Sequence, residues 1–256
     1  MIGAFYEQLD DGVFRSTRWT TGPWGPDAQH AGPPSALLGR AIERAAPETA
    51  HVARVTAEIL RPVPIADLRV EARTVRPGRS VALIEASLSA GDDAVVRASA
   101  WVIRTTDLDV PAQPTVPSPA PPDGLPNLFD ERAETDYIAA MEWRFVAGSF
   151  FEPGPATAWL RMKLPLVAGE EPSPLQRVLT AADSASGISG ALDFSKWVYV
   201  NPDLTVHLHR PLDGEWVCLD AVTTPEPSGV GLTAAALYDR RGPIGRSAQS
   251  LFVAPR

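Results

Sequence analysis

The sequence predicts an α+β protein made of two similar halves, each an antiparallel sheet around one apolar helix. Three observations predict it: a proline-rich segment in the middle of the chain, one helix followed by four strands on either side of that segment, and an Arg-Pro pair that recurs in the second half. The 256 residues, 45% of them hydrophobic and 21% charged, are enough for two such units.

The boundary between the halves is the segment 105–136. Proline fixes φ and cannot donate to a strand ladder, and long connectors are uncommon inside one compact domain. The prolines of this segment are Pro111, Pro114, Pro117, Pro119, Pro121, Pro122 and Pro126. We therefore predict an N-terminal unit over residues 1–104, an extended linker over 105–136 and a C-terminal unit over 137–256.

In the N-terminal half, residues 32–46 predict a helix. Pro33 and Pro34 suit its first turn, and apolar residues recur at helical spacing after them. Segments rich in Val and Ile follow, separated by turn signals of Gly, Pro and Asp. We predict strands at 51–60, 68–76, 80–89 and 94–104, with a leading strand at 12–20.

The C-terminal half repeats this order. Residues 174–187 predict a helix, with Ser173 as its N-cap. Strands are predicted at 197–209, 215–224, 229–238 and 244–253, after leading strands at 141–148 and 156–164.

A single offset relates the two halves. Arg61-Pro62 recurs as Arg210-Pro211, and the same spacing aligns residues 97–100 with 246–249. It also aligns Pro34 with Asp183, so we expect these two residues in matching helices and the two Arg-Pro pairs in superposable positions.

One helix followed by antiparallel strands gives a sheet that curls around the helix. Such a helix must be apolar over most of its surface, as Leu37, Leu38, Val178 and Leu179 and the alanines around them suggest. This arrangement is the hotdog fold, and the chain is predicted to be a double hotdog: two antiparallel sheets, each wrapped around a central helix.

Charge and composition exclude several classes of protein. A net charge of −8 argues against a nucleic-acid partner. The single cysteine, Cys218, excludes an internal disulfide and fits a reducing compartment. We see no signal peptide in the first twelve residues and no apolar stretch of about 18 residues that could span a membrane. We expect a soluble, cytoplasmic protein.

The second half resembles the C-terminal hotdog of the acyl-CoA thioesterase II family. The residues that carry the resemblance are LTAAD at 179–183, NPDLTVHLHRP at 201–211 and RSAQ at 246–249. In the first half, QHAGPPSALL at 29–38 is similar to the glycine-containing start of that family's first helix. The order and spacing of these short motifs cover nearly the whole chain outside the linker.

The resemblance implies a site in which an Asp, a Thr and a Gln hold an attacking water. Asp183 and Gln249 match the Asp and the Gln, whereas the Thr position falls on Asn201. This departs from the family, although an amide can both donate and accept a hydrogen bond. The candidate catalytic residues are therefore Asp183, Asn201 and Gln249, and the candidate substrate-binding residues are His30 and Gly32.

Each candidate catalytic residue also has a structural interpretation. Asp183 interrupts an apolar helix face, which favours a function, because burying an unpaired carboxylate is costly; the alternative is a solvated Asp near the helix end. Gln249 aligns with Ala100, so it either marks a polar site or faces outward from its strand. Asn201 precedes Pro202, and Asn-Pro is also a common turn signal.

The leading hypothesis is hydrolysis of an acyl-CoA thioester to free acid and CoA by an activated water, without a metal or cofactor. Backbone N–H groups at a helix start would bind the oxyanion, and an apolar channel beside the helix would take the acyl chain. Because Asn201 replaces Thr, the alternative is an acyl-thioester-binding or lipid-binding protein without hydrolysis. A third alternative is a hotdog hydratase or dehydratase. Such an enzyme needs an Asp and a His spaced more widely than Asp27 and His30, which are the nearest candidates. We also expect self-association as a homodimer.

Two other kinds of site are rejected. His207 and His209 lack the further ligands that zinc needs. The GISGA segment at 187–191 narrowly misses the nucleophile motif of serine hydrolases, and those histidines follow it too closely for that fold. Cys218, between two apolar residues, is interpreted as a small buried hydrophobe.

Overall fold

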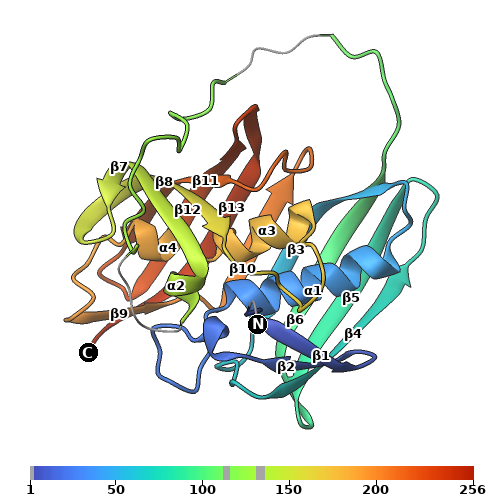
Figure 1. Ribbon diagram of the computed structural model, residues 1–256, viewed down its shortest axis with the longest axis horizontal. Coiled ribbons are helices and arrows are strands. Elements are labelled where there is room, and N and C mark those ends of the chain that lie inside the picture. The colour runs from blue at the N-terminus through green and yellow to red at the C-terminus, as the bar shows by residue number, and fades with distance from the viewer. Residues whose placement is uncertain (1–2, 112–115, 131–135) are drawn as a thin grey trace.

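The computed structural model describes residues 3–111, 116–130 and 136–256 and shows one large curved sheet with the helices packed on one side of it (Figure 1). The strand order in this 13-stranded sheet is β1-β2-β4-β5-β6-β3-β10-β13-β12-β11-β8-β7, and β9 also pairs with β13. Neighbouring strands are antiparallel, as the sequence predicts.

The elements of the N-terminal half agree with the prediction within a few residues, apart from its first part. There, the predicted strand at 12–20 is a short strand followed by a 3-10 helix, and an additional strand precedes it. The elements are β1 (Tyr6–Asp10), β2 (Val13–Ser16), η1 (Arg18–Thr20), α1 (Gly32–Ala45), β3 (Ala50–Ile59), β4 (Asp67–Arg76), β5 (Val81–Ala90) and β6 (Asp93–Arg104).

In the C-terminal half, two predicted elements are broken. The helix predicted at 174–187 is interrupted at Asp183 and Ser184, and the strand predicted at 197–209 is interrupted at Asn201 and Pro202. The elements are α2 (Tyr137–Ala140), β7 (Met141–Ser149), β8 (Glu152–Met162), α3 (Pro174–Ala182), α4 (Ala185–Ile188), β9 (Trp197–Val200), β10 (Asp203–Leu208), β11 (Val217–Pro225), β12 (Val230–Asp239) and β13 (Gly242–Pro255).

The two halves meet at β3 and β10, which pair in the centre of the sheet. Outward from this pair, β6, β5, β4, β2 and β1 on one side correspond in order to β13, β12, β11, β8 and β7 on the other. The two predicted sheets are therefore joined edge to edge into one, with a pseudo-twofold relation between the halves.

Strand pairing follows the predicted offset between the halves. Thr56 pairs with Ser99, and Thr205, 149 residues after Thr56, pairs with Ala248. The offset fails in the helices: Pro34 lies in the first turn of α1, whereas Asp183 follows the last residue of α3. The expected match of Pro34 with Asp183 is wrong because α3 begins at Pro174, 142 residues after the start of α1 at Gly32, so the helices do not share the strand offset of 149.

The described residues of the segment 105–136 contain no helix or strand. Residues 116–130 run along the C-terminal half, where the indole N–H of Trp159 donates to the carbonyl oxygen of Ala120 at 2.7 Å. Arg240 also pairs with Asp123 at 2.6 Å. The unit boundaries at 104 and 136 remain a prediction.

Helices α1 and α3 pack antiparallel and very closely (Figure 1). A Cβ on Gly32 would lie 2.3 Å from the carbonyl oxygen of Thr180, and one on Gly39 would lie 2.5 Å from a methyl group of Leu179. The start of α1 therefore touches the end of α3, and one buried apolar cluster includes residues of both halves.

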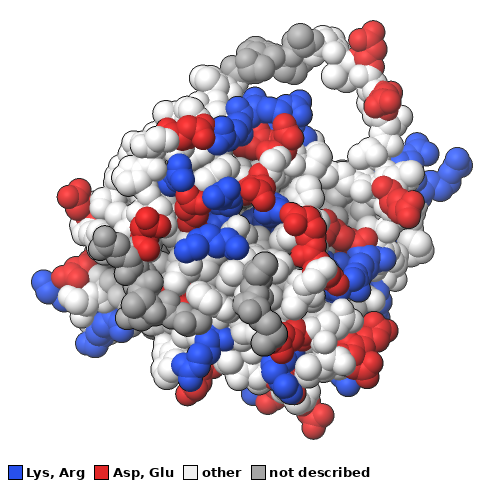
Figure 2. Space-filling model, viewed as in Figure 1, with Lys and Arg blue, Asp and Glu red and all other residues white. Residues whose placement is uncertain are grey.

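The surface is charged but mixed in sign. On the face shown in Figure 2, the Lys and Arg side chains alternate with Asp and Glu side chains. Among the described residues, no helix has the length and hydrophobicity needed to cross a membrane.

Candidate active site

The three candidate catalytic residues come together at the end of α3. The side chain of Asp183 is only 4% exposed. Its Oδ1 accepts a hydrogen bond from Asn201 Nδ2 at 2.8 Å and another from Gln249 Nε2 at 3.2 Å. Both amides therefore bond the carboxylate directly and fill the lone pairs of Oδ1.

Local structure explains how Asn201 and Gln249 reach Asp183. Asn201 lies at the break between β9 and β10, both of which pair with β13, the strand that carries Gln249. The Oε1 of Gln249 accepts the backbone N–H of Ser186 at 3.2 Å, near the start of α4. Gln249 therefore links the sheet to both short helices around Asp183.

The second oxygen of Asp183 faces a residue of the other half. Nδ1 of His30 lies 3.1 Å from Asp183 Oδ2. The His30 ring stacks on Tyr137, with centroids 3.7 Å apart and planes 8° from parallel. The Tyr137 hydroxyl in turn donates to the carbonyl oxygen of Thr180 at 2.7 Å. The site is thus built at the junction of both halves.

Gly32 contributes its backbone to the site. Its N–H points at His30 Nδ1, 3.1 Å away, and can donate to that nitrogen only when it carries no proton. Any side chain at this position would collide with the carbonyl oxygen of Thr180, so glycine is what allows α1 to start beside the end of α3. Of the two predicted substrate-binding residues, His30 lies in direct contact with Asp183, and Gly32 lies next to His30.

Burial controls the protonation of the aromatic members of the site. It lowers the pKa of His30 below its ordinary value, and the charge of Asp183 only partly offsets this. It also raises the pKa of the Tyr137 hydroxyl well above its ordinary value. Both side chains are therefore neutral at neutral pH, and His30 is the one basic side chain within 4 Å of Asp183 among the residues that the structure describes.

One member of this site, Tyr137, had no clear sequence signal. Tyr137 follows the linker without any motif. The sequence placed Asp27 nearest to His30 as an acidic partner, but Asp27 is exposed and the carboxylate beside His30 is that of Asp183. This contact depends on the packing of α1 against α3, which no local pattern encodes.

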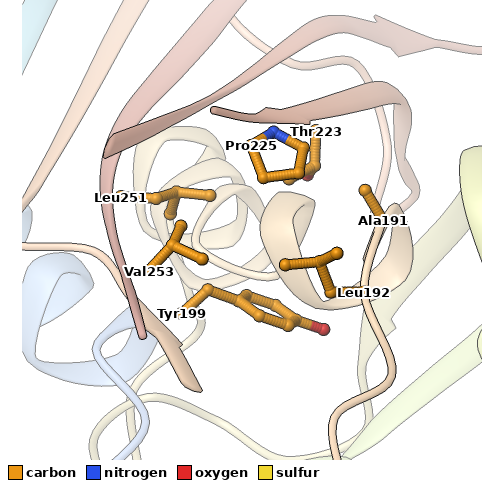
Figure 3. Close-up of a pocket in the computed structure, with 7 residues that line it drawn as sticks. All are labelled: Ala191, Leu192, Tyr199, Thr223, Pro225, Leu251 and Val253. Carbon is orange, nitrogen blue, oxygen red and sulfur yellow. The ribbon is translucent and has the colours of Figure 1, made fainter. Parts of the chain in front are cut away.

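A small apolar pocket lies farther along β13 (Figure 3). It is a narrow crevice, too tight in this structure to hold a water molecule. Leu251 and Val253 follow Gln249 at alternate positions of the strand, and side chains in a strand alternate between faces, so all three lie on one face. The pocket is lined by Ala191, Leu192, Tyr199, Thr223, Pro225, Leu251 and Val253.

A larger groove of about 350 Å³ lies at the other end of the helix pair, where α1 ends and α3 begins. The strand offset puts Val52 at the position of Asn201 and Ala100 at that of Gln249. Val52 lines this groove. This groove is therefore the pseudo-twofold counterpart of the Asp183 site, but it lacks the two amides of Asn201 and Gln249.

Three other residues considered in the sequence analysis lie outside this site. Cys218 is buried in a cluster with Trp159 and Trp216, and burial raises the pKa of its thiol. His207 and His209 are exposed, and the described part of the chain contains no group of three His, Cys, Asp or Glu side chains that could hold a metal.

The antiparallel sheet, its paired central helices and a polar site between the halves define a double hotdog protein. Residues 20–103 match the N-terminal domain of acyl-CoA thioesterases, and residues 111–253 match the C-terminal domain of acyl-CoA thioesterases. The chain therefore belongs to the acyl-CoA thioesterase II family, which confirms the resemblance seen in the sequence.

Solved structures share the fold over nearly the whole chain. A thioesterase II candidate from Thermobifida fusca is 16% identical, with a TM-score of 0.77 over 97% of this chain and 95% of that one. A hotdog protein of unknown function from Alicyclobacillus acidocaldarius is 15% identical, with a TM-score of 0.76 over 96% and 95%. The acyl-CoA thioesterase II of Mycobacterium marinum is 16% identical, with a TM-score of 0.70 over 98% and 96%. No curated protein matches the chain.

Proposed function

We propose that this protein hydrolyses acyl-CoA thioesters to a free acid and CoA by means of an activated water. The observation that carries the proposal is the buried carboxylate of Asp183, held by two amides and a neutral histidine where the halves meet. Burying a carboxylate without a Lys or Arg partner is costly, and such groups gather at functional sites. Membership of a thioesterase family supports the same reaction.

The contacts suggest a role for each residue. Asn201 and Gln249 occupy Oδ1 of Asp183, so they fix the carboxylate and leave Oδ2 for His30. The oxyanion needs a donor that is already in place. The backbone N–H of Gly32 is suited to this role, because it lies in the first turn of α1, where the helix dipole favours negative charge.

The acyl chain would occupy the apolar pocket beyond Gln249. Leu251 and Val253 continue the face of β13 that carries Gln249 and form one wall of that pocket (Figure 3). Because this crevice is too tight to hold a water molecule, an acyl group would enter only if its lining side chains moved apart, and the CoA moiety would remain outside.

The proposal is tested by release of free thiol from a panel of acyl-CoAs with the full-length protein. Asp183→Asn should lower kcat/KM by about a hundredfold or more, the usual effect of losing a group that takes part in acid–base catalysis. Asp203→Asn is the matched control, because Asp203 lies on neighbouring β10 and accepts the backbone N–H of Ser250 at 2.9 Å. The control should stay within a few-fold of the wild type.

The alternative predicted from the sequence is binding without hydrolysis. If the wild-type protein binds acyl-CoAs but releases no thiol from any of them, the hydrolytic proposal is wrong and the binding function replaces it.

The contact between His30 and Asp183 favours a second candidate reaction, the addition of water to a 2-enoyl-CoA. Hydration removes the conjugated double bond and keeps the thioester intact, whereas hydrolysis releases the thiol. Measuring the loss of the conjugated double bond and the release of thiol on one enoyl-CoA substrate distinguishes the two reactions.

We also propose that the protein acts in the cytoplasm as a homodimer. The sheet ends at β1 and β7, and sheet edges commonly form further contacts. A monomeric mass by light scattering at micromolar concentration would contradict the dimer, and cell fractionation tests the location.

A further inference from the structure

We propose that His30 is the general base of this site, and that its Nε2 takes the proton of the attacking water while Asp183 holds its Nδ1. The inference rests on the proposed hydrolysis. It assigns the proton to a residue of the first half, although the three candidate catalytic residues from the sequence all lie in the second.

His30 is held at three points: one ring nitrogen, one ring face and the backbone. Nδ1 lies 3.1 Å from Asp183 Oδ2, one ring face stacks on Tyr137 at 3.7 Å, and the backbone N–H of His30 donates to the carbonyl oxygen of Thr20 at 2.8 Å. Tyr137 is itself fixed, because its hydroxyl bonds Thr180 O and Ser184 Oγ. These contacts hold the imidazole in one orientation before substrate binds, as an efficient base requires.

Of the two members of the pair, His30 is the accessible one. Its side chain is 15% exposed, compared with 4% for Asp183, whose Oδ1 is already bonded to two amides. Within the described part of the chain, Nε2 of His30 has no hydrogen-bond partner and is not among the buried polar atoms that lack one. A water molecule can therefore approach Nε2 more readily than the carboxylate.

The contacts of Nδ1 select the tautomer that leaves Nε2 free. Nδ1 faces both the carboxylate Oδ2 of Asp183 and the N–H of Gly32. If Nδ1 carried no proton, its lone pair would face a carboxylate oxygen 3.1 Å away. A proton on Nδ1 instead donates to Asp183, leaves the lone pair on Nε2, and releases the Gly32 N–H for the thioester carbonyl oxygen.

Electrostatics support this role. The titratable groups that face the ring are Asp183 at the end of α3 and Tyr137 in α2. Burial lowers the pKa of His30, so the free base is present at neutral pH, and the phenol of Tyr137 stays uncharged. The negative charge of Asp183 then stabilises the imidazolium that forms during the reaction.

The step balances without a further reactant. The water oxygen bonds to the thioester carbonyl carbon, the water proton moves to Nε2, and the carbonyl electron pair moves to oxygen beside Gly32 N–H. When the oxyanion collapses, the carbon–sulfur bond breaks and the CoA sulfur takes the proton from Nε2. The products are the carboxylic acid and the CoA thiol.

The test compares His30→Asn with the wild type. The amide nitrogen of Asn can replace Nδ1 as the donor to Asp183, but nothing replaces Nε2. We expect kcat/KM to fall by roughly 10²- to 10⁴-fold. We also expect the wild-type kcat/KM to decline at acid pH through one ionisation below the ordinary His pKa, and the variant to lose that decline. His51→Asn is the control: this histidine is also partly buried, at the opposite end of the helix pair, and should keep the wild-type rate and pH profile.

A second variant separates a base from a structural residue. His30→Ala leaves space beside Tyr137, so added imidazole should restore activity in proportion to its unprotonated fraction. If the wild type hydrolyses thioesters and both His30 variants keep its rate and acid limb, or if imidazole restores nothing to an inactive, folded His30→Ala, the inference is wrong. If the wild type hydrolyses no thioester, the proposed function fails instead.

Discussion

The hydroxyl of Thr205 donates to the hydroxyl of Thr56 at 3.1 Å, and the two residues are 149 positions apart. This is the offset that relates the two halves of the sequence, and the residues also face each other in the register of β3 and β10. A residue that pairs with its own counterpart lies on the axis relating the two halves. The two threonines therefore mark the pseudo-twofold axis at the centre of the sheet.

Replacing these threonines should reveal a coupled pair. Thr56→Val or Thr205→Val removes one partner of a partly buried hydrogen bond, and each should lower the free energy of unfolding by about 1 kcal/mol. The double variant should cost less than the sum of both, because it leaves no unpaired hydroxyl. Urea unfolding of the four proteins measures this, and strictly additive effects would contradict a direct bond.

The two Arg-Pro pairs should differ in their contribution to stability. Arg61 pairs with Asp93, whose side chain is 62% exposed, whereas Arg210 pairs with Asp239, whose side chain is fully buried. Asp239→Asn should therefore cost about 2–4 kcal/mol of unfolding free energy, and Asp93→Asn less than about 1 kcal/mol. Equal losses in chemical unfolding would show that burial of the pair has no effect.

The contribution of Asp239 to the free energy of unfolding should depend on pH. Burial raises the pKa of this carboxyl, but hydrogen bonds from Arg210 and from the backbone N–H groups of Asp213 and Arg241 outweigh it, so the net direction is downward. A depressed folded-state pKa stabilises the fold above the unfolded value of about 4 and loses that effect as pH falls through the folded value. The difference between wild type and Asp239→Asn should be constant near neutral pH and shrink below about pH 4.

The sequence predicts the repeated strands well but not the interruptions that form the site. Alternating apolar residues and turn signals are local, so β3 to β6 and β11 to β13 are predicted within a few residues. The predicted helix at 174–187 and the predicted strand at 197–209 each break at a site residue, Asp183 and Asn201. Pro202 explains the second break, because proline cannot continue the ladder.

The partner of Asp183 could not be predicted from local patterns. Its contact with His30 depends on two helices from different halves that pack antiparallel at close range. The sequence contains a trace of that packing in Gly32 and Gly39, where a Cβ would collide with α3. A glycine in a helix has many possible explanations, so these two glycines indicate close helix packing only once the positions of both helices are known.

Narrowing the apolar pocket should change the preference for acyl chain length. Val253→Phe adds bulk to the pocket wall, so kcat/KM should fall more for longer acyl-CoAs than for acetyl-CoA. Val230→Phe is the control, because Val230 lies on neighbouring β12 and is 61% exposed. Rates measured over a series of chain lengths decide the outcome, and a uniform loss for all lengths would argue that the chain binds elsewhere.

The departure at Asn201 makes a further prediction. Asn201 Nδ2 donates to Asp183 Oδ1 at 2.8 Å, and a threonine hydroxyl can supply the same donor. Asn201→Thr should therefore keep kcat/KM within about tenfold of the wild type, a change of about 1.4 kcal/mol. Asn201→Leu has no donor and leaves Oδ1 with one hydrogen bond fewer, so its loss of kcat/KM should be larger.

Gln249→Ala should lower kcat/KM about tenfold, because it also removes a hydrogen bond to Oδ1. It should also lower the melting temperature, because the backbone N–H of Ser186 loses its acceptor. Steady-state rates and thermal unfolding of the three variants provide the comparison. If Asn201→Leu is as active as Asn201→Thr while both remain folded, the amide is a turn residue and not part of the site.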